Sequence, residues 1–286
     1  MAGLDDYTRE TRQWLDEEFE SFGDACYNDY FDLDRFEREH AEHYFYNLVH
    51  LAHIRREPLG TFLDVGGAEG AFAHRVTQEC GSRSYNAEIS HSALVKGRRL
   101  FGVSGAVSDM HVLPWRDGAV DLVFSSNALE HVTRPREALE EMWRIAGRGI
   151  MVITPGRWTD SSRDLFCDPA PDTPHRHLHF FSPDDYREML PGLDLEFRGV
   201  GFLPFYFLTV LVSGRPVSER QRRKYSMGKL AAYRLLRWIA PLTGAWTIRL
   251  AVGLDPWMSR IFRNWTTHVM VIARRSPRRS PGGARP

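Results

Sequence analysis

The stretch "TFLDVGGAEGAFAHRV", Thr61–Val76, decides the fold. Its first residues are apolar and predict a short strand, and the sequence from Ala71 to Cys80 predicts a helix that Gly81 ends. Between them lie an aspartate and three glycines within five positions. Glycines at the end of a strand allow unusual dihedrals and let a ligand approach the backbone closely. A tight turn without a ligand is the alternative interpretation of the loop alone.

The loop differs from two nucleotide-binding signatures. From Gly66 it reads G-G-A-E-G, which does not match G-x-G-x-x-G, and no Gly-Lys-Ser/Thr follows it. Glu69 is expected to repel a diphosphate, and Asp64 precedes the glycines. The loop therefore favours a ligand that carries a positive group.

Working outward, strand and helix patterns alternate as far as about residue 200. Helices are expected at 71–80, 92–100, 135–146 and 182–190, and strands at 61–66, 84–89, 105–109, 119–126, 149–155 and 194–202, with a final strand at 264–275. Alternation at this spacing predicts an α/β fold with a doubly wound, mostly parallel sheet.

Four regions are expected along the chain. They are an N-terminal helical lid (1–58), a core (59–203 with 264–275), a basic helical insertion (204–263) and a disordered tail (276–286). Tyr27, Tyr30 and His40 are candidate lid residues that contact a ligand.

Three carboxylates follow three successive expected strands. Asp64 ends the first, Glu88 ends the second, and Asp109 follows the third. Ligands of open parallel sheets bind at this edge. A carboxylate at Glu88 can accept hydrogen bonds from both hydroxyls of a ribose, and one at Asp109 can accept from an exocyclic amine. Each alone is typical of a solvated loop, but together they predict a ligand site.

Residues 61–155 resemble the class I S-adenosylmethionine-dependent methyltransferases, especially the small-molecule group. The resemblance is carried by "FLDVGGAEG", "AEIS", "GIMVITP" and the long segment "SDMHVLPWRDGAVDLVFSSNALEHVTRPREALEEMWRIA". It implies a Rossmann-like seven-stranded sheet, S-adenosylmethionine as cofactor and S-adenosylhomocysteine as product.

The resemblance also implies a set of cofactor contacts. Asp64 and the loop from Gly66 to Gly70 would contact the methionine portion, Glu88 the ribose, and Asp109 the adenine. The full cofactor-binding prediction is Asp64, Gly66, Gly67, Ala68, Gly70, Glu88, Ile89, Asp109, Met110, Ser126 and Asn127. Ala68 replaces a glycine frequent in the family, and the turn at 147–149 is shorter than usual.

Three histidines are predicted to be catalytic: His131, His177 and His179. A histidine has the pKa range of a base for a hydroxyl group, although each could instead only pack near the cofactor. In "PHRHLHFF" alternate histidines share one face of an extended segment. No carboxylate or cysteine lies at suitable spacing, so no metal site is expected.

Charge is divided unevenly along the chain. Residues 1–214 hold 21 Lys and Arg against 35 Asp and Glu, whereas residues 215–286 hold 16 against 2. In the insertion, Met227, Ala231, Leu235, Trp238 and Leu242 are expected to form one apolar helical stripe. It could cap the core, lie on an anionic membrane through residues 215–263, or pair with the acidic remainder of this chain or of a homodimer partner. Nucleic acid is a weaker alternative, because no RNA-binding module is recognised.

These patterns predict a small-molecule methyltransferase, most plausibly an O-methyltransferase of bacterial secondary metabolism or glycolipid synthesis. One alternative is a membrane-surface enzyme for a lipidic or quinone acceptor. Another is a non-catalytic protein that binds the cofactor as a regulator or partner. The acidic first twenty residues and three scattered cysteines predict a cytoplasmic protein, with peripheral membrane association left open.

Overall fold

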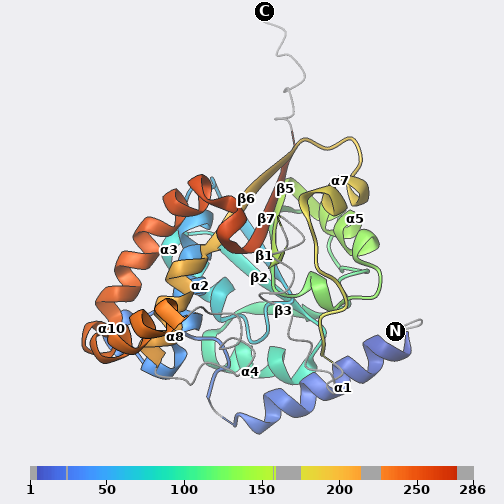
Figure 1. Cartoon of the computed structure of the whole chain (residues 1–286). Coiled ribbons are helices and arrows are strands. Elements are labelled where there is room, and N and C mark those ends of the chain that lie inside the picture. The colour runs from blue at the N-terminus through green and yellow to red at the C-terminus, as the bar shows by residue number, and fades with distance from the viewer. Residues whose placement is uncertain (1–4, 24, 157, 159–174, 214–226, 276–286) are drawn as a thin grey trace, which may run out of the picture.

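The computed structural model describes residues 5–23, 25–156, 158, 175–213 and 227–275, with only the backbone described for 227–243. Its centre is a seven-stranded sheet in the order β3-β2-β1-β4-β5-β7-β6 (Figure 1). The strands pair in parallel except β7, which is antiparallel to both of its neighbours. The predicted doubly wound, mostly parallel seven-stranded sheet is confirmed.

The described elements follow the predicted alternation closely. The strands are β1 (Thr61–Val65), β2 (Arg83–Glu88), β3 (Ser104–Val107), β4 (Val120–Ser126), β5 (Ala146–Pro155), β6 (Leu195–Phe202) and β7 (Thr266–Arg274). The helices are α1 (Asp6–Ser21), α2 (Ala41–Ile54), α3 (Ala71–Cys80), α4 (His91–Phe101), α5 (Pro135–Ile145), α7 (Pro183–Met189), α8 (Leu203–Ser213) and α10 (Met227–Ile261).

The central strands are apolar on both faces, because helices cover both. Along β5, Met151 and Ile153 pack into one core with α2, α3, α8 and α10, whereas Ile150 and Val152 pack into a second core with α5 and α7. All four side chains are fully buried. The alternation of successive side chains between two faces produces these two cores.

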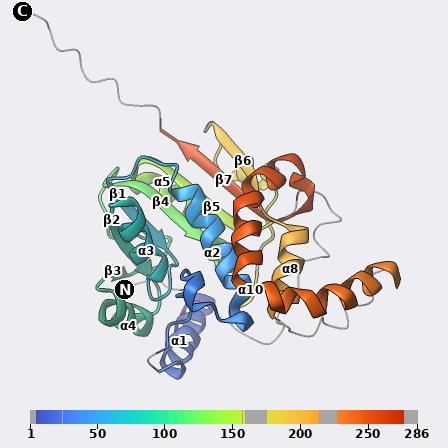
Figure 2. The same cartoon turned by 90° about the vertical axis from the view of Figure 1, so that its left-hand side faces the viewer.

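The helices around the sheet form separate groups. Helix α1 packs beside α4, and α2, α8 and α10 form a group on the other side of the molecule (Figures 1 and 2). The region 22–40, expected as helical, holds only two short 3-10 turns, at Leu33–Arg35 and Arg38–His40. Ala146 was expected to end a helix and residues 147–149 to form a turn, but β5 already begins at Ala146, which pairs with Val120.

Helix α10 bends at Gly244, whose φ of 36° and ψ of −119° are not helical. The expected stripe from Met227 to Leu242, and the tail 276–286, fall outside the described side chains. Among the described residues no helix is both long and apolar enough to cross a membrane.

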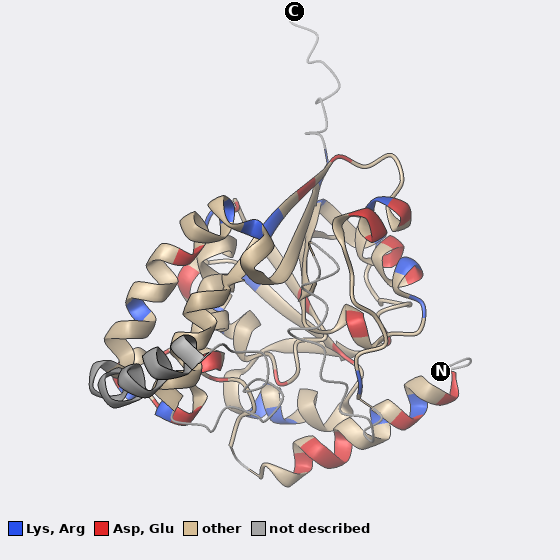
Figure 3. Cartoon of the chain, in the orientation of Figure 1, with Lys and Arg blue, Asp and Glu red and all other residues tan. Residues whose placement is uncertain are grey.

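Some basic residues of the C-terminal region form ion pairs with acidic residues of the N-terminal region. Arg249 pairs with Asp34 at 2.5 Å, and Arg274 pairs with Glu57 at 2.7 Å. Figure 3 shows clustered acidic positions on α1. Part of the basic C-terminal region therefore neutralises acids near the N-terminus.

Candidate functional site

A cavity of about 680 Å³ lies at the carboxyl ends of the parallel strands. Its walls come from α1, α2, the glycine loop, the residues after β2, β3 and β4, the segment 175–177, and the start of β7. Its described lining includes six carboxylates and seven histidines but no lysine or arginine. The carboxylates are Glu18, Glu42, Asp64, Glu88, Asp109 and Glu130, and the histidines are His43, His50, His111, His131, His175, His177 and His268. A cavity of this composition suits a cationic or neutral ligand and disfavours a phosphate.

The glycine loop turns sharply, and its glycine positions could not hold a larger side chain without strain or a clash. Gly66 and Gly70 have φ of 75° and 78°, in the left-handed region that favours glycine. A Cβ on Gly67 would lie 2.4 Å from Asn86 Oδ1 and 2.6 Å from the Asp64 carboxyl carbon. Ala68 adopts a φ of 49° without being glycine, so the departure from the family pattern retains the left-handed conformation.

Asp64 is buried at the base of this loop, 4% exposed. Burial, and next the nearby carboxylate of Glu88, raise the pKa of Asp64 to about 8. No lysine or arginine of the described lining offsets this. A ligand ammonium or sulfonium group would supply the positive charge that stabilises the ionised carboxylate.

Glu88 connects the end of β2 to the loop. Its Oε2 accepts a hydrogen bond from the Ala68 N–H at 2.9 Å, and its Oε1 accepts from the N–H groups of Ile89 and Ser90. Burial raises the pKa of Glu88. Because a carboxylate offers about four acceptor positions, the backbone leaves room for a further donor such as a ribose hydroxyl.

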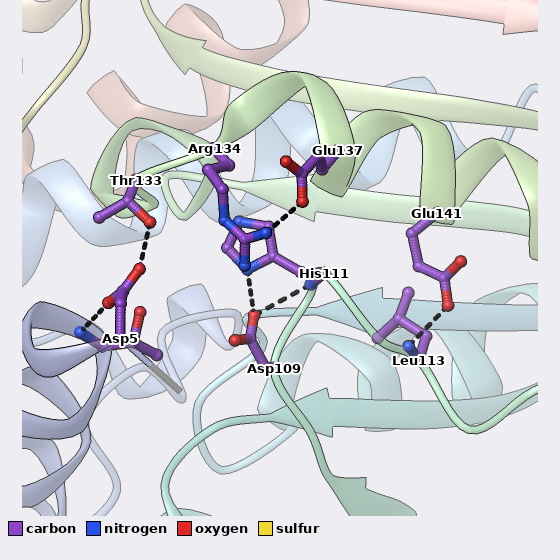
Figure 4. A network of polar contacts seen from close by, with 9 residues as sticks. Asp5, Asp109, His111, Leu113, Thr133, Arg134, Glu137 and Glu141 are labelled. Carbon is purple, nitrogen blue, oxygen red and sulfur yellow. Dashed lines mark hydrogen bonds and ion pairs between the residues drawn. The ribbon is translucent and has the colours of Figure 1, made fainter. Parts of the chain in front are cut away.

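Asp109 lines the cavity, and the side chains of His111 and Arg134 contact its carboxylate (Figure 4). Its Oδ1 accepts from the His111 N–H at 2.9 Å and contacts His111 Nδ1 at 2.5 Å. The Arg134 guanidinium lies beside it. Although burial acts to raise it, the pKa of Asp109 is lowered by the hydrogen bonds from His111 and by Arg134.

Glu69 does not face the cavity, which corrects the expectation that it would repel a diphosphate there. Its buried carboxylate pairs with Lys96 at 3.3 Å and accepts from the Tyr27 N–H at 3.0 Å. The Glu69–Lys96 pair therefore holds the chain after α1 against α4.

Helix α1 closes one side of the cavity and is fixed at both ends. Asp5 accepts from Thr133 Oγ1 at 2.7 Å and caps the helix at Thr8 (Figure 4), and Asp16 accepts from Ser90 Oγ at 2.7 Å. The Thr8 and Thr133 hydrogen bonds lower the pKa of Asp5 to about 2. Tyr27 also lines the cavity, whereas Tyr30 stacks on His40 outside the described lining.

At the opposite side, histidines from separate segments come together. The ring of His131 stacks on that of His175, with centroids 3.7 Å apart, and meets that of His177 edge-on at 4.8 Å. Burial lowers the pKa of His131 to about 3 and that of His175 to about 4. These imidazoles are therefore neutral at pH 7.

The cavity contains every predicted site residue except Gly70 and His179. Gly70 caps α3, and His179 Nε2 bonds the Val132 carbonyl oxygen at 2.9 Å. Sequence reasoning missed His50, His268 and Glu130. The "LEHV" motif contained Glu130 beside His131, but His50 on α2 and His268 on β7 carried no local signal.

Known proteins share part of this sequence and its fold. A family model described as "Methyltransferase domain" matches residues 63–153. This range contains the glycine loop and all three strand-end carboxylates. Residues 63–153 thus match a methyltransferase domain. Because its buried Asp64 lacks a cationic partner among the described lining, the methyltransferase domain fits the sulfonium cofactor S-adenosylmethionine.

A protein named "Uncharacterized methyltransferase" from Mycolicibacterium gilvum is 35% identical over 97 residues, which cover 32% of this chain and 37% of that protein. The chain thus matches little more than a third of this relative's length.

Solved structures share the fold. A Thermotoga maritima protein, named as a possible histamine N-methyltransferase, has a TM-score of 0.54 at 14% identity, covering 94% of this chain and 99% of its own. The [4+2]-cyclase SpnF has a TM-score of 0.54 at 16% identity, covering 93% of both chains.

Proposed function

We propose that the protein transfers a methyl group from S-adenosylmethionine to an oxygen of a small-molecule acceptor. The observation that carries this proposal is the single cavity that joins the loop carboxylates to a group of neutral imidazoles. The loop half suits the cofactor, and the imidazole half leaves space for an acceptor. A role in bacterial secondary metabolism or glycolipid synthesis stays a prediction from the sequence.

The lining limits the charge of the acceptor. Six carboxylates and no lysine or arginine surround the cavity among its described residues. An acceptor with a carboxylate or a phosphate inside the cavity would meet repulsion without a cationic partner. The acceptor group that enters is therefore neutral or cationic, and a hydroxyl group fits.

Methylation of a hydroxyl group requires alignment and removal of one proton. S-adenosylmethionine, when bound, supplies a methyl group on a sulfonium sulfur, and the C–S electron pair returns to sulfur as the new O–C bond forms. His131 Nδ1 faces the carbonyl oxygen of Arg176 at 3.0 Å, so it carries the proton and Nε2 keeps a lone pair. We propose that His131 and His177 receive the hydroxyl proton, whereas His179 Nε2 is bonded to the Val132 carbonyl oxygen.

Calorimetric titration with S-adenosylhomocysteine tests the cofactor half of this proposal. The protein should bind it with micromolar affinity, and Asp64→Ala and Glu88→Ala should each weaken binding at least tenfold. Asp121→Ala is the matched control, because Asp121 lies on β4 and bonds Gly60 and Thr61 outside the cavity. Failure of the intact protein to bind would overturn the proposal.

A non-catalytic role is the alternative of another class. The likeness to SpnF shows that this fold also occurs in a protein named as a cyclase, and a fold alone does not fix an activity. Release of S-adenosylhomocysteine during incubation with a panel of hydroxylated and amine acceptors separates the two. Binding without turnover on any acceptor would favour a regulator or partner.

A second candidate function is methylation at a membrane surface. After the bend in α10, Trp246, Leu250, Leu254, Trp257 and Ile261 are exposed at spacings of three and four. Such spacing places them along one side of the helix. Trp246 and Trp257 are 64% and 62% exposed. Tryptophan-rich apolar stripes of this kind lie in the interfacial zone of a bilayer.

The charges around this stripe fit an anionic lipid surface. Arg249, Arg260 and Arg263 lie within the same region, and its one acid, Asp255, is fully buried beneath the N–H groups of Gly201 and Phe202. No exposed acid of residues 244–265 would repel anionic headgroups. We therefore assign the stripe to anionic lipid.

Sedimentation with phosphatidylglycerol vesicles at low salt tests this assignment. The protein should sediment with them, and a Trp246→Ser, Trp257→Ser variant should lose most of that binding. Val112→Ser is the control, since Val112 is 73% exposed but lies far along the chain on the loop after β3. Equal sedimentation of the double variant and the parent would refute the membrane role and leave the cofactor site untouched.

A further inference from the structure

The carboxyl group of Glu130 is the least explained polar group of the cavity. Glu130 is 0% exposed, and within the described part of the chain neither Oε1 nor Oε2 has a hydrogen-bond partner. Buried carboxyl groups almost always have partners, because an unpartnered one costs several kcal/mol. Glu130 is among the residues that line the cavity, but its two carboxyl oxygens are themselves buried. A ligand that satisfies them must be small enough to lie between buried side chains, as a metal ion is.

His131 presents a lone pair to the same carboxyl group. Its Nδ1 lies 3.0 Å from the Arg176 carbonyl oxygen, which accepts a hydrogen bond and so fixes the proton on Nδ1. Its Nε2 lies 3.9 Å from Glu130 Oε1. Two electron-pair donors therefore face one another across a gap that suits a cation. A histidine that binds a metal through one ring nitrogen usually donates the N–H of its other nitrogen to an acceptor such as a backbone carbonyl oxygen, which fixes the ring orientation.

His177 adds a third donor from a separate segment. One ligand atom each from Glu130, His131 and His177 lie within 4.8 Å of one another. The Nδ1 of His177 is buried and has no hydrogen-bond partner among the residues that the structure describes. The backbone fixes this arrangement, because the N–H groups of Leu178 and His179 both bond the Glu130 carbonyl oxygen. The segment after residue 174 is thereby held against the "LEHV" turn.

We propose that Glu130, His131 and His177 bind one divalent transition-metal ion at the acceptor side of the cavity. Two neutral imidazoles and one carboxylate are a donor set that Zn²⁺ and Fe²⁺ prefer, with positions left open for a substrate. An ion at about 2.1 Å from each donor would draw them together by roughly 1 Å. The fold thus supplies the carboxylate that the sequence spacing around the three histidines lacked.

The use of this ion rests on the proposed function. A bound cation next to the acceptor would polarise its hydroxyl group and lower the pKa of that group. With the ion bound, His131 and His177 would be ligands, and the hydroxyl proton would pass to water; their role as proton acceptors would apply to the metal-free protein. The lack of lysine and arginine in the described lining leaves the ion as the positive charge that balances Glu130.

Metal titration of the tag-free protein, after removal of metals with a chelator, tests the site directly. Co²⁺ should bind at one ion per chain with a visible absorption band of low-symmetry coordination, and Zn²⁺ should displace it. Glu130→Gln and His177→Ala should each weaken Co²⁺ binding at least tenfold. Because His177 is only partly buried, His177→Ala should fold even where Glu130→Gln does not, and circular dichroism checks both variants.

Two controls separate this site from other histidines. His179→Ala changes a histidine two residues away that bonds Val132, and His40→Ala removes an exposed cluster with Glu37 and Glu39. Both variants should keep the band and the stoichiometry. Absence of Co²⁺ binding by the parent protein, or equal loss in His179→Ala, would overturn the metal site. Titration with S-adenosylhomocysteine in the same samples reports the proposed function separately.

Discussion

The loop half of the cavity comes from consecutive strand ends, Asp64, Glu88 and Asp109, within fifty residues of chain. The imidazole half comes from α2, the turn after β4, the segment 175–177 and β7. Every carboxylate of the first half could be found by reading strand ends. The histidines of the second half meet only because the sheet and α2 place distant segments side by side.

The two halves also differ in how their charge is balanced. In the loop half Glu88 is held by three backbone N–H groups, and Asp109 by His111. In the imidazole half neither oxygen of Glu130 has a hydrogen-bond partner among the described residues. Glu88 and Asp109 are thus partnered from within the chain, whereas the carboxyl group of Glu130 has no hydrogen bond among the described residues.

The largest effect is expected from Gly67→Ala. A Cβ at this position would lie 2.4 Å from Asn86 Oδ1, so the loop must shift, at a cost of about 2–3 kcal/mol of unfolding free energy. S-adenosylhomocysteine affinity should fall more than tenfold in calorimetry, while Co²⁺ binding changes less than about threefold. Gly253→Ala is the control, because nothing lies within 4 Å of its Cβ position. Loss of both ligands together in a folded Gly67→Ala protein would show that the halves are not separable.

His268 of the imidazole half and Asp64 of the loop half should change stability in opposite directions on acidification. Burial lowers the pKa of His268 to about 3, so between pH 7 and pH 5 only the unfolded chain takes up this proton, and stability falls by about 2 kcal/mol. The pKa of Asp64 is raised from 3.8 to about 8, so its contribution is fully present only below about pH 3.8 and is lost as pH rises to about 8. Acidification from pH 7 to pH 5 therefore restores part of it. In urea unfolding, His268→Gln should reduce the loss of stability between pH 7 and pH 5, and Asp64→Asn should enlarge it. Parallel shifts in the two variants would contradict this.

Cofactor affinity should also depend on the ionisation of Asp64. With a pKa of about 8, its carboxylate forms mainly above that pH, and the ammonium group of S-adenosylhomocysteine favours the ionised form. Affinity measured by calorimetry should rise by up to about tenfold per pH unit between pH 6 and pH 8. Asp64→Asn should bind weakly with a flat profile, and a profile that stays steep in this variant would assign the titration to another group.

The smallest effect is expected from Ala68→Gly. Glycine would relieve the φ of 49°, but it also gives the unfolded chain more freedom. The two terms nearly cancel, so unfolding free energy should change by less than about 1 kcal/mol and cofactor affinity by less than about twofold. A tenfold change in affinity would show that the Ala68 methyl group contacts the ligand.

The doubly wound, mostly parallel seven-stranded sheet and the loop half of the cavity could be predicted from the sequence alone. Asp64, Glu88 and Asp109 follow apolar strands directly, and parallel strands bring their carboxyl ends to one edge. Local rules of this kind need no knowledge of distant contacts. They also identified His131 and His177, but not what faces them.

The residues that surround Glu130 could not be predicted from the sequence, because they depend on tertiary contacts. The residue stands beside His131 in the sequence, yet its burial and its third neighbour depend on the segment after residue 174 bonding its carbonyl oxygen. His50 and His268 enter the cavity because α2 covers the sheet and β7 inserts antiparallel between β5 and β6. His50 and His268 are more than two hundred residues apart in the chain and come together only through tertiary packing. Local sequence patterns therefore could not predict their contact.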